Sequence, residues 1–319
     1  MRTLLLIALM VGLVVGSPLP SPARAAAPAS TSTPSWLSCP DAATLRDARG
    51  VVLLVPGTGS RPDEAFSWGY QRALTAEGYA TCTVSLAKDG LASFTRAAVR
   101  VRRAIRVTAA LAGRRISVIG HSQGGALPVW AVKYWPAAAA VVDDVVSLAG
   151  PFGGTQLGNE LCLLNRCSPL AWQLRQGSRT VAALRRAPLP ARVSVTSLAG
   201  PYDEIVRPQP QASELPGAVN IVLNQVCPAD PSEHGLILGD PVGWALTLDA
   251  LTHPGPGDPA RIDPATCQQA FIPHGDPAGS PVFVQSILRF ALGLANPTGW
   301  VDAEPALPRY ARGTGAGGR

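Results

Sequence analysis

The chain has 319 residues, of which 47% are hydrophobic and 15% are charged, and its formal net charge is +6. This composition is typical of a globular protein with a well-filled core, and the length fits one large α/β domain. The densest basic run, Arg96 to Arg106, is spaced like the solvated side of a helix. Because there is no basic stripe interleaved with aromatic residues and no recognisable nucleic-acid-binding module, a nucleic-acid partner is not expected.

The first 25 residues have the pattern of a secretory signal peptide. A charged start at Met1-Arg2 is followed by an apolar run from Leu4 to Val15 and by the small-residue cleavage pattern Ala23-Arg24-Ala25. The run is too short to span a bilayer, and no longer one is expected after Ala25, so we predict a secreted, extracellular protein without a transmembrane anchor. Residues 26–35 are small, polar and proline-containing, which is typical of a disordered leader.

Strand and helix patterns alternate through residues 36–295, the predicted main domain. In chain order the pattern predicts a strand at 51–55, a helix at 64–77, a strand at 79–86, a helix at 91–111, a strand at 116–119, a helix at 126–133, strands at 145–148, 193–198 and 219–223, and a helix at 282–294. Such alternation predicts an α/β fold with a mostly parallel sheet and helices on both faces.

Two segments depart from this rhythm. Residues 152–190 contain a glycine-rich turn, two close cysteines and an arginine-rich helical stretch, and their position predicts a cap or lid over the active edge of the sheet. Residues 296–319 are rich in Gly, Pro and Ala, which predicts a flexible C-terminal tail.

Six cysteines follow the signal peptide, and an even number in an exported protein predicts disulfides. The spacing favours a short local loop between Cys162 and Cys167, and the order along the chain suggests Cys39 with Cys82 and Cys227 with Cys267. A zinc site is not expected, because there is no CxxC pair and no histidine beside these cysteines.

The sequence Gly120-His121-Ser122-Gln123-Gly124 fits the pattern G-x-S-x-G. It directly follows an apolar strand and precedes a helix, which is the context that a nucleophile elbow requires. In such an elbow the hydroxyl stands above the sheet, and the N-terminus of the helix faces developing negative charge. We therefore predict that Ser122 is a nucleophile.

A serine nucleophile needs a base, which in this type of fold follows the acid in the chain. His234 comes shortly after the strand at 219–223, where a loop leaves the active edge, and it is the predicted base. His253 and His274 lie in loops rich in proline and glycine and are predicted to be surface residues. His121 adjoins the serine in sequence and cannot turn back to act as its base.

The acid is expected at the end of the preceding strand. Asp203 follows the strand at 193–198 and is the predicted acid, with Glu204 as the alternative. Asp143 and Asp144 precede a strand instead of ending one, so we predict structural roles for them.

Hydrolysis of an acyl group also needs hydrogen-bond donors for the oxyanion. The backbone N–H of Gln123, which follows the nucleophile, is one predicted donor. The other is Thr58, through its backbone and its hydroxyl, in the loop Pro56-Gly57-Thr58-Gly59-Ser60. This loop lacks the lysine of a phosphate-binding loop.

Several segments together resemble one known family, the lipases related to Candida antarctica lipase B, which are α/β-hydrolases. The segments that carry the resemblance lie between Cys39 and Cys267, and Asp203-Glu204-Ile205-Val206 with Pro208-Gln209 is the most specific of them. The others are Val55 to Gly59, Gly78-Tyr79 with Cys82, Ser122 to Gly125, and Gln225-Val226-Cys227 leading to His234.

The resemblance implies the same residues that the sequence pattern predicts. It implies Ser122, Asp203 and His234 as nucleophile, acid and base, Thr58 and Gln123 as the oxyanion hole, and disulfides Cys39–Cys82 and Cys227–Cys267. The residue before the nucleophile is His121, where the family's lipase has tryptophan, so the alcohol selectivity of that lipase does not carry over.

The function implied is that of a secreted lipase or carboxylesterase that forms an acyl-enzyme without a metal or organic cofactor. Acylglycerols, met at a lipid–water interface, are the expected substrates, and we expect a monomer. One alternative is a short-chain esterase or cutinase-like polyesterase. An alternative of another class is a non-catalytic lipid-binding protein on the same fold.

Overall fold

The structure, a computed structural model, describes residues 33–312. The predicted signal peptide, residues 1–25, and most of the predicted leader lie outside the described residues.

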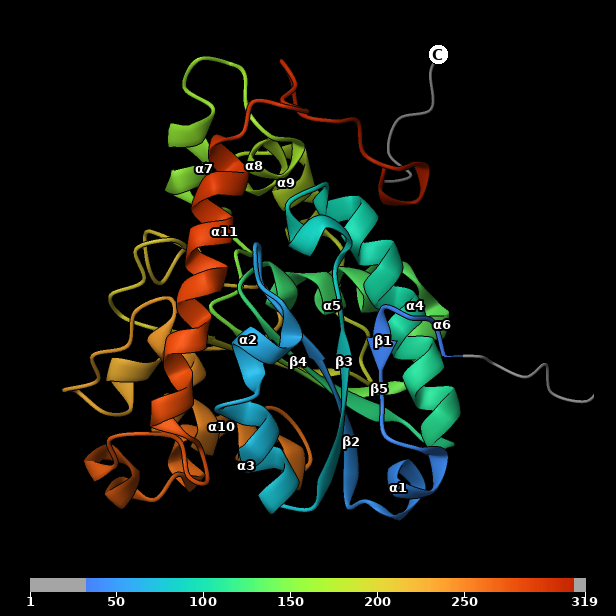
Figure 1. Cartoon of the computed structure of the whole chain (residues 1–319), viewed down its shortest axis with the longest axis vertical. Coiled ribbons are helices and arrows are strands. Elements are labelled where there is room, and N and C mark those ends of the chain that lie inside the picture. The colour runs from blue at the N-terminus through green and yellow to red at the C-terminus, as the bar shows by residue number, and fades with distance from the viewer. Residues whose placement is uncertain (1–32, 313–319) are drawn as a thin grey trace, which may run out of the picture. The chain divides into compact units, whose positions relative to one another are not determined.

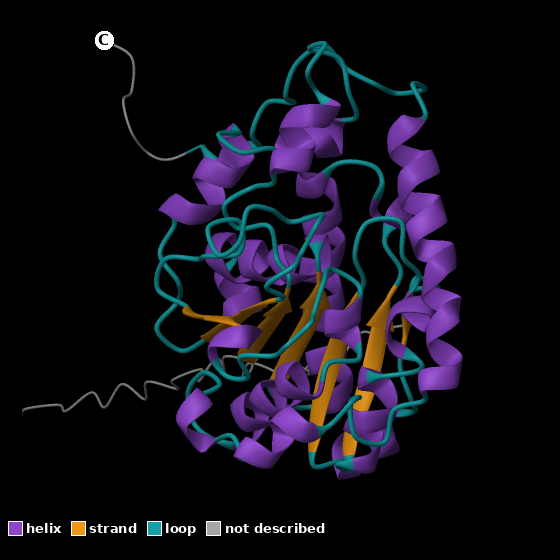
Figure 2. Cartoon of the chain, turned by 90° about the vertical axis from the view of Figure 1, so that its left-hand side faces the viewer, coloured by secondary structure: helices purple, strands orange, loops and turns teal. Residues whose placement is uncertain are grey.

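The described chain is built on a seven-stranded sheet with the strand order β1-β3-β2-β4-β5-β6-β7. Neighbouring strands run parallel, except that β1 is antiparallel to β3. The strands are β1 (Leu37–Ser38), β2 (Gly50–Val55), β3 (Tyr79–Val84), β4 (Ile116–His121), β5 (Val142–Leu148), β6 (Ser194–Ala199) and β7 (Val219–Val222). The predicted α/β class is confirmed, with helices on both faces of the sheet (Figure 2).

Alternate side chains of the strands enter two separate hydrophobic layers. In β2, Val51, Leu53 and Val55 pack with α4 and α5, whereas Val52 and Leu54 pack with α2, α3 and α10. Because successive side chains of a strand point to opposite faces, a strand covered on both sides needs an unbroken apolar run.

The helices, most of which are labelled in Figure 1, are α1 (Ala42–Asp47), α2 (Pro62–Phe66), α3 (Tyr70–Ala76), α4 (Phe94–Ala112), α5 (Gln123–Tyr134), α6 (Pro136–Ala139), α7 (Gln156–Leu161), α8 (Pro169–Leu174), α9 (Arg179–Arg186), α10 (Pro241–Thr252) and α11 (Val284–Ala295).

Two predicted elements need correction, and one helix was not predicted. The predicted helix at 64–77 is two helices, α2 and α3, because the backbone is not helical at Gly69 and a Cβ there would lie 2.6 Å from the carbonyl oxygen of Leu238. Asp143 and Asp144 lie inside β5 and do not precede it. The pattern also gives no sign of α10, since a helix buried on most of its sides has no amphipathic period.

The segment 152–190 forms α7, α8 and α9, and the disulfide Cys162–Cys167 joins the end of α7 to the residues before α8. The other disulfides are Cys39–Cys82 and Cys227–Cys267. These are the pairings that the order and spacing of the cysteines suggest.

Residues 296–312 pack against the domain and do not form the predicted flexible tail. Val301 and Cys167 exchange backbone hydrogen bonds of 2.9 and 3.3 Å. The carboxylate of Glu304 accepts the backbone N–H groups of Arg179 and Thr180, both at 2.9 Å, and so caps the N-terminus of α9. The backbone of Val301 and the carboxylate of Glu304 therefore hold this segment to the domain.

One stretch of the described chain, Pro277–Ala295, is helical, long and apolar enough to cross a membrane by length and composition, with a mean hydropathy of 1.3. This differs from the expectation that no such run follows Ala25. The stretch includes α11, whose Arg289 donates two hydrogen bonds to Glu64 at 2.7 and 2.8 Å. On its other side Leu288 and Leu292 are 58% and 72% exposed. One side of α11 is thus tied to the domain, and the other faces outward.

The turn from β4 into α5 brings backbone against backbone. A Cβ on Gly124 would lie 2.2 Å from the carbonyl oxygen of Val55, and a Cβ on Gly120 would lie 2.0 Å from that of Gly124. Only glycine allows this separation, because these neighbours are backbone atoms that cannot rotate away.

We expect Gly124→Ala to lower the free energy of unfolding by about 3 kcal/mol, because the added methyl group overlaps β2. Gly243→Ala in α10 is the matched control, since its Cβ would meet nothing closer than 3.6 Å. That control should be neutral or stabilising by up to about 1 kcal/mol, as expected when alanine replaces glycine in a helix. Urea denaturation of both variants measures the difference, and equal stabilities would contradict the overlap.

Candidate active site

Ser122 lies between β4 and α5 in a backbone conformation that is rare for a residue with a side chain, with φ 55° and ψ −129°. The glycine contacts around the turn hold the serine there. Strained backbone of this kind is found at functional sites, and a nucleophile elbow requires it. The serine is only 8% exposed, and it sits at the N-terminus of α5, where backbone N–H groups have no intrahelical acceptor.

The structure brings the predicted acid and base together. Asp203 Oδ2 lies 2.9 Å from Nδ1 of His234, and Asp203 Oδ1 accepts the backbone N–H groups of Ile205 and Val206 at 2.9 and 2.6 Å. Both oxygens of this carboxylate are therefore fixed in direction. Glu204, the alternative acid, accepts the backbone N–H of His234 at 3.3 Å and makes no hydrogen bond to its ring.

The surroundings of His234 shift its affinity for a proton. Burial acts to lower the pKa of His234, but the charge and hydrogen bond of Asp203, with Glu204 and Glu233 nearby, outweigh burial and raise the pKa above 6.5. Because a carboxylate can only accept, the neutral ring carries its proton on Nδ1, which leaves Nε2 free to act as a base.

Ser122 and His234 line the same cavity, which has a volume of about 80 Å³. A second, apolar slot of about 40 Å³ is also lined by Ser122. The slot is lined by residues of the segment 152–190 and of α11, together with Thr58, Ile205 and Val206. The residues of that segment and of α11 that form its apolar wall are Leu157, Leu161, Leu170, Ala171, Leu174, Phe290 and Leu294.

Thr58 lies beside Ser122 and lines both cavities. Its hydroxyl donates to Oε1 of Gln123 at 3.0 Å, so the two predicted oxyanion donors are in contact. A Cβ on the neighbouring Gly57 would lie 3.0 Å from the Cβ of Ser122, which keeps the backbone of this loop close to the nucleophile. The arrangement places N–H and O–H donors around the serine.

Of the remaining histidines, two are exposed and the third is buried with a hydrogen bond to the backbone of His234. His253 is exposed and pairs with Asp249 at 3.0 Å, and His274 is also exposed. His121 is buried, and its Nε2 lies 2.8 Å from the backbone carbonyl oxygen of His234.

Comparison with known proteins supports the α/β-hydrolase fold that the sequence predicts. No family model matches the chain. The chain is 32% identical to lipase B of Pseudozyma antarctica over 166 residues, which are 51% of this chain and 48% of that protein. The match thus spans about half the length of this curated relative. The crystal structure of Aspergillus fumigatus lipase B superposes with a TM-score of 0.78 at 27% identity, over 87% of this chain and 70% of the other.

The chain has an α/β-hydrolase fold and is similar to lipase B. The resemblance stated from the sequence is thereby confirmed. A lipase of Bacillus licheniformis is more distant, with a TM-score of 0.44 and 18% identity over 54% of this chain and 74% of the other.

In this α/β-hydrolase, α11 contributes residues to the site that the sequence analysis did not assign. Phe283, which directly precedes α11, and Ile287 and Phe290 of α11 line the cavities beside Ser122. Arg289 donates to the carbonyl oxygen of Gly59 at 2.7 Å, so α11 also fixes the loop that carries Thr58. The single charged residue of this largely apolar helix is the sequence signal that points to such an anchor.

The ion pair that holds α11 persists in acid. Hydrogen bonds from Arg289, which outweigh the effect of burial, lower the pKa of Glu64 to about 2. The anchor of the helix is therefore charged over the whole working range of pH.

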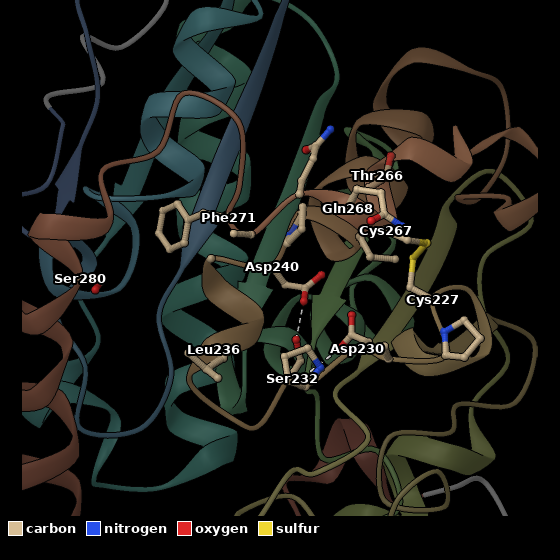
Figure 3. Close-up of a pocket in the computed structure, with 18 of the residues that line it drawn as sticks. Cys227, Asp230, Ser232, Leu236, Asp240, Thr266, Cys267, Gln268, Phe271 and Ser280 are labelled. Atoms are coloured by element: carbon tan, nitrogen blue, oxygen red, sulfur yellow. Dashed lines mark hydrogen bonds between the residues drawn. A yellow bond between two sulfur atoms is a disulfide. The ribbon is translucent and has the colours of Figure 1, made fainter.

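A larger cavity of about 590 Å³ lies behind the loop that carries His234 (Figure 3). Ser232 donates its hydroxyl to Asp240, and Asp230 accepts the backbone N–H of Ser232 at 2.9 Å. Burial, with Asp230 close by, raises the pKa of Asp240 to about 6. Within residues 33–312 no group of three or more His, Cys, Asp or Glu residues is placed to hold a metal ion.

We expect Asp203→Asn to lower the pKa of His234 by more than about one unit, because it removes the charge that opposes the effect of burial. Titration of the His234 ring by NMR in both proteins measures the shift. An unchanged pKa in the variant would show that Asp203 does not govern this imidazole.

We expect Asp240→Asn to raise stability at neutral pH by about 1–3 kcal/mol. The pKa of Asp240 in the folded chain, about 6, is above its ordinary 3.8. Ionisation of Asp240 therefore lowers the free energy of unfolding of the protein as the pH rises from about 4 to about 6. Asparagine mimics the protonated acid and still caps α10.

The gain from Asp240→Asn should therefore disappear near pH 4. Thermal unfolding at a series of pH values tests this, with Asp263→Asn, an exposed helix cap, as the control for replacing a capping carboxylate by an amide. A gain that is equally large at pH 4 would contradict the assignment.

Proposed function

We propose that this chain is a serine hydrolase of carboxylic esters, with Ser122 as nucleophile, His234 as base and Asp203 as acid. The observation that carries the proposal is the convergence of three elements on one small cavity: a strained serine after β4, a hydrogen-bonded Asp–His pair from the loops after β6 and β7, and two donors beside the serine. A carboxyl-end site of this kind is where α/β sheets bind their ligands.

In the proposed reaction the hydroxyl of Ser122 attacks the ester carbonyl and passes its proton to Nε2 of His234. Asp203 keeps the ring in the required tautomer and stabilises the imidazolium. The imidazolium then protonates the leaving alcohol, and water, activated by the same histidine, releases the acid.

Two features of the resting site have to change when substrate binds. The described residues provide no hydrogen bond between the Ser122 hydroxyl and His234, and such contacts often tighten only in the complex with substrate. The hydroxyl of Thr58 has to turn from Gln123 toward the oxyanion, joining the backbone N–H of Gln123 as a donor.

Acylglycerols are the proposed substrates. The apolar slot beside Ser122 suits an acyl chain, and two relatives of the chain are named lipase B. We also propose that the protein is secreted, because three disulfides suit an oxidising compartment and the sequence begins with a signal-peptide pattern.

The small volume of the slot, about 40 Å³, favours a second candidate, an esterase of short acyl chains. In that case long chains would need a rearrangement of the slot wall formed by the segment 152–190 and α11. Movement of that segment as a lid remains a prediction.

Hydrolysis of p-nitrophenyl esters from acetate to palmitate tests both candidates. We expect Ser122→Ala to lower kcat by roughly 10⁴-fold or more. The exposed Ser85→Ala should retain full activity and serves as the control. A preference for long chains supports the lipase and a preference for short chains supports the esterase.

Labelling by an active-serine phosphonate separates catalysis from mere binding. The wild-type chain should be labelled at Ser122, and the alanine variant should not. Absence of both Ser122-dependent hydrolysis and labelling would overturn the enzyme and favour a non-catalytic lipid-binding protein.

A further inference from the structure

His121 is a buried titratable residue that the proposed reaction does not use. It is the last residue of β4, directly before Ser122, and it is 2% exposed. Its ring lies 4.8 Å from the ring of His234 between centroids and meets Phe283 edge-on at 5.9 Å. Burial, with His234 nearby, lowers the pKa of His121 to about 3, so the ring is neutral at any working pH.

The hydrogen bonds of His121 determine which nitrogen carries its proton. Its Nε2 lies 2.8 Å from the backbone carbonyl oxygen of His234, which can only accept, so Nε2 must be the donor. Its Nδ1 is buried and has no hydrogen-bond partner. It faces Gly57, where a Cβ would lie 3.2 Å away. An unprotonated Nδ1 fits this position, because no acceptor is available there for an N–H.

His234 is consequently held at three of its atoms. Asp203 holds Nδ1 of the ring, Glu204 accepts the backbone N–H at 3.3 Å, and His121 donates to the carbonyl oxygen. Rotation of the ring is limited by the first contact, and displacement of the backbone is limited by the other two. His121 is the only one of the three that is attached directly to the nucleophile in sequence.

We propose that His121 is a positioning residue, whose Nε2–H fixes the backbone of His234 at a set distance from Ser122. Because residues 121 and 122 are adjacent, this hydrogen bond links the base to the nucleophile without passing through the acid. The proposal rests on the proposed ester hydrolysis and deepens it.

Loss of the hydrogen bond from His121 should slow the reaction most in the step in which His234 acts as an acid. A p-nitrophenolate leaves without protonation, whereas an alkoxide needs the proton of the His234 imidazolium. If the base residue is displaced, alkyl esters should therefore lose more activity than p-nitrophenyl esters. Loss of stability alone lowers both activities equally.

His121→Gln and His121→Met form a matched pair for the test. The two side chains have similar length and volume, and only glutamine retains an N–H donor. We expect kcat/KM for p-nitrophenyl butyrate to fall roughly 10-fold in His121→Met, mainly through kcat, since misplacement by a fraction of an ångström is costly. With ethyl butyrate the fall should be at least about tenfold greater, and His121→Gln should remain within about threefold of wild type.

Equal losses in the two variants, or an unchanged ratio of aryl-ester to alkyl-ester activity in His121→Met, would overturn the proposal while leaving the hydrolase intact. If the wild-type chain shows no Ser122-dependent hydrolysis, the proposed function and this proposal fail together. The two failures are distinguished by assaying the wild type and Ser122→Ala first.

A measurement on the unaltered protein covers the case in which His121→Met does not fold. Nitrogen-15 NMR of histidine-labelled wild-type chain should assign the proton of His121 to Nε2 throughout the neutral range, with no titration there. A proton on Nδ1, or titration of His121 near neutral pH, would overturn the proposal.

Discussion

The contact between the backbones of α5 and β2 is the constraint on which the site depends. Gly120 and Gly124 allow the helix to start against the strand, and Ser122, in the turn between them, has a positive φ of 55°. The same contact directs the N-terminus of α5 toward the cavity. Since parallel strands end at one edge of the sheet, the loops after β6 and β7 deliver Asp203 and His234 to that position.

Much of this could be predicted from the sequence because the signals are local. Unbroken apolar runs mark strands that are covered on both faces, and a glycine-flanked serine after such a run marks the turn. The order of serine, acid and base then leaves few candidates, and Asp203 and His234 are the two that the structure joins by a hydrogen bond. Glu204 remained the alternative acid in the sequence, because it follows the same strand as Asp203.

Features that depend on tertiary contacts could not be predicted from the sequence pattern. The break at Gly69 follows from the approach of the Leu238 carbonyl group, which lies far along the chain. The buried helix α10 lacks a periodic signal, and the packing of residues 296–312 depends on partners such as the N-terminus of α9. The place of α11 beside Ser122 is set by Arg289, whose partner Glu64 lies 225 positions earlier.

The contacts of residues 296–312 have a consequence for biosynthesis. The N-terminus of α9 is capped by Glu304, and Cys167 and Trp172 both bond to Val301, so helices of the slot wall depend on residues made more than a hundred positions later. Because chains are synthesised from the N-terminus, the sheet can assemble before these partners exist. These helices can therefore gain their contacts with Val301 and Glu304 only after both residues have been synthesised, and a nascent chain arrested before Val301 would carry the serine elbow beside a slot wall that lacks them.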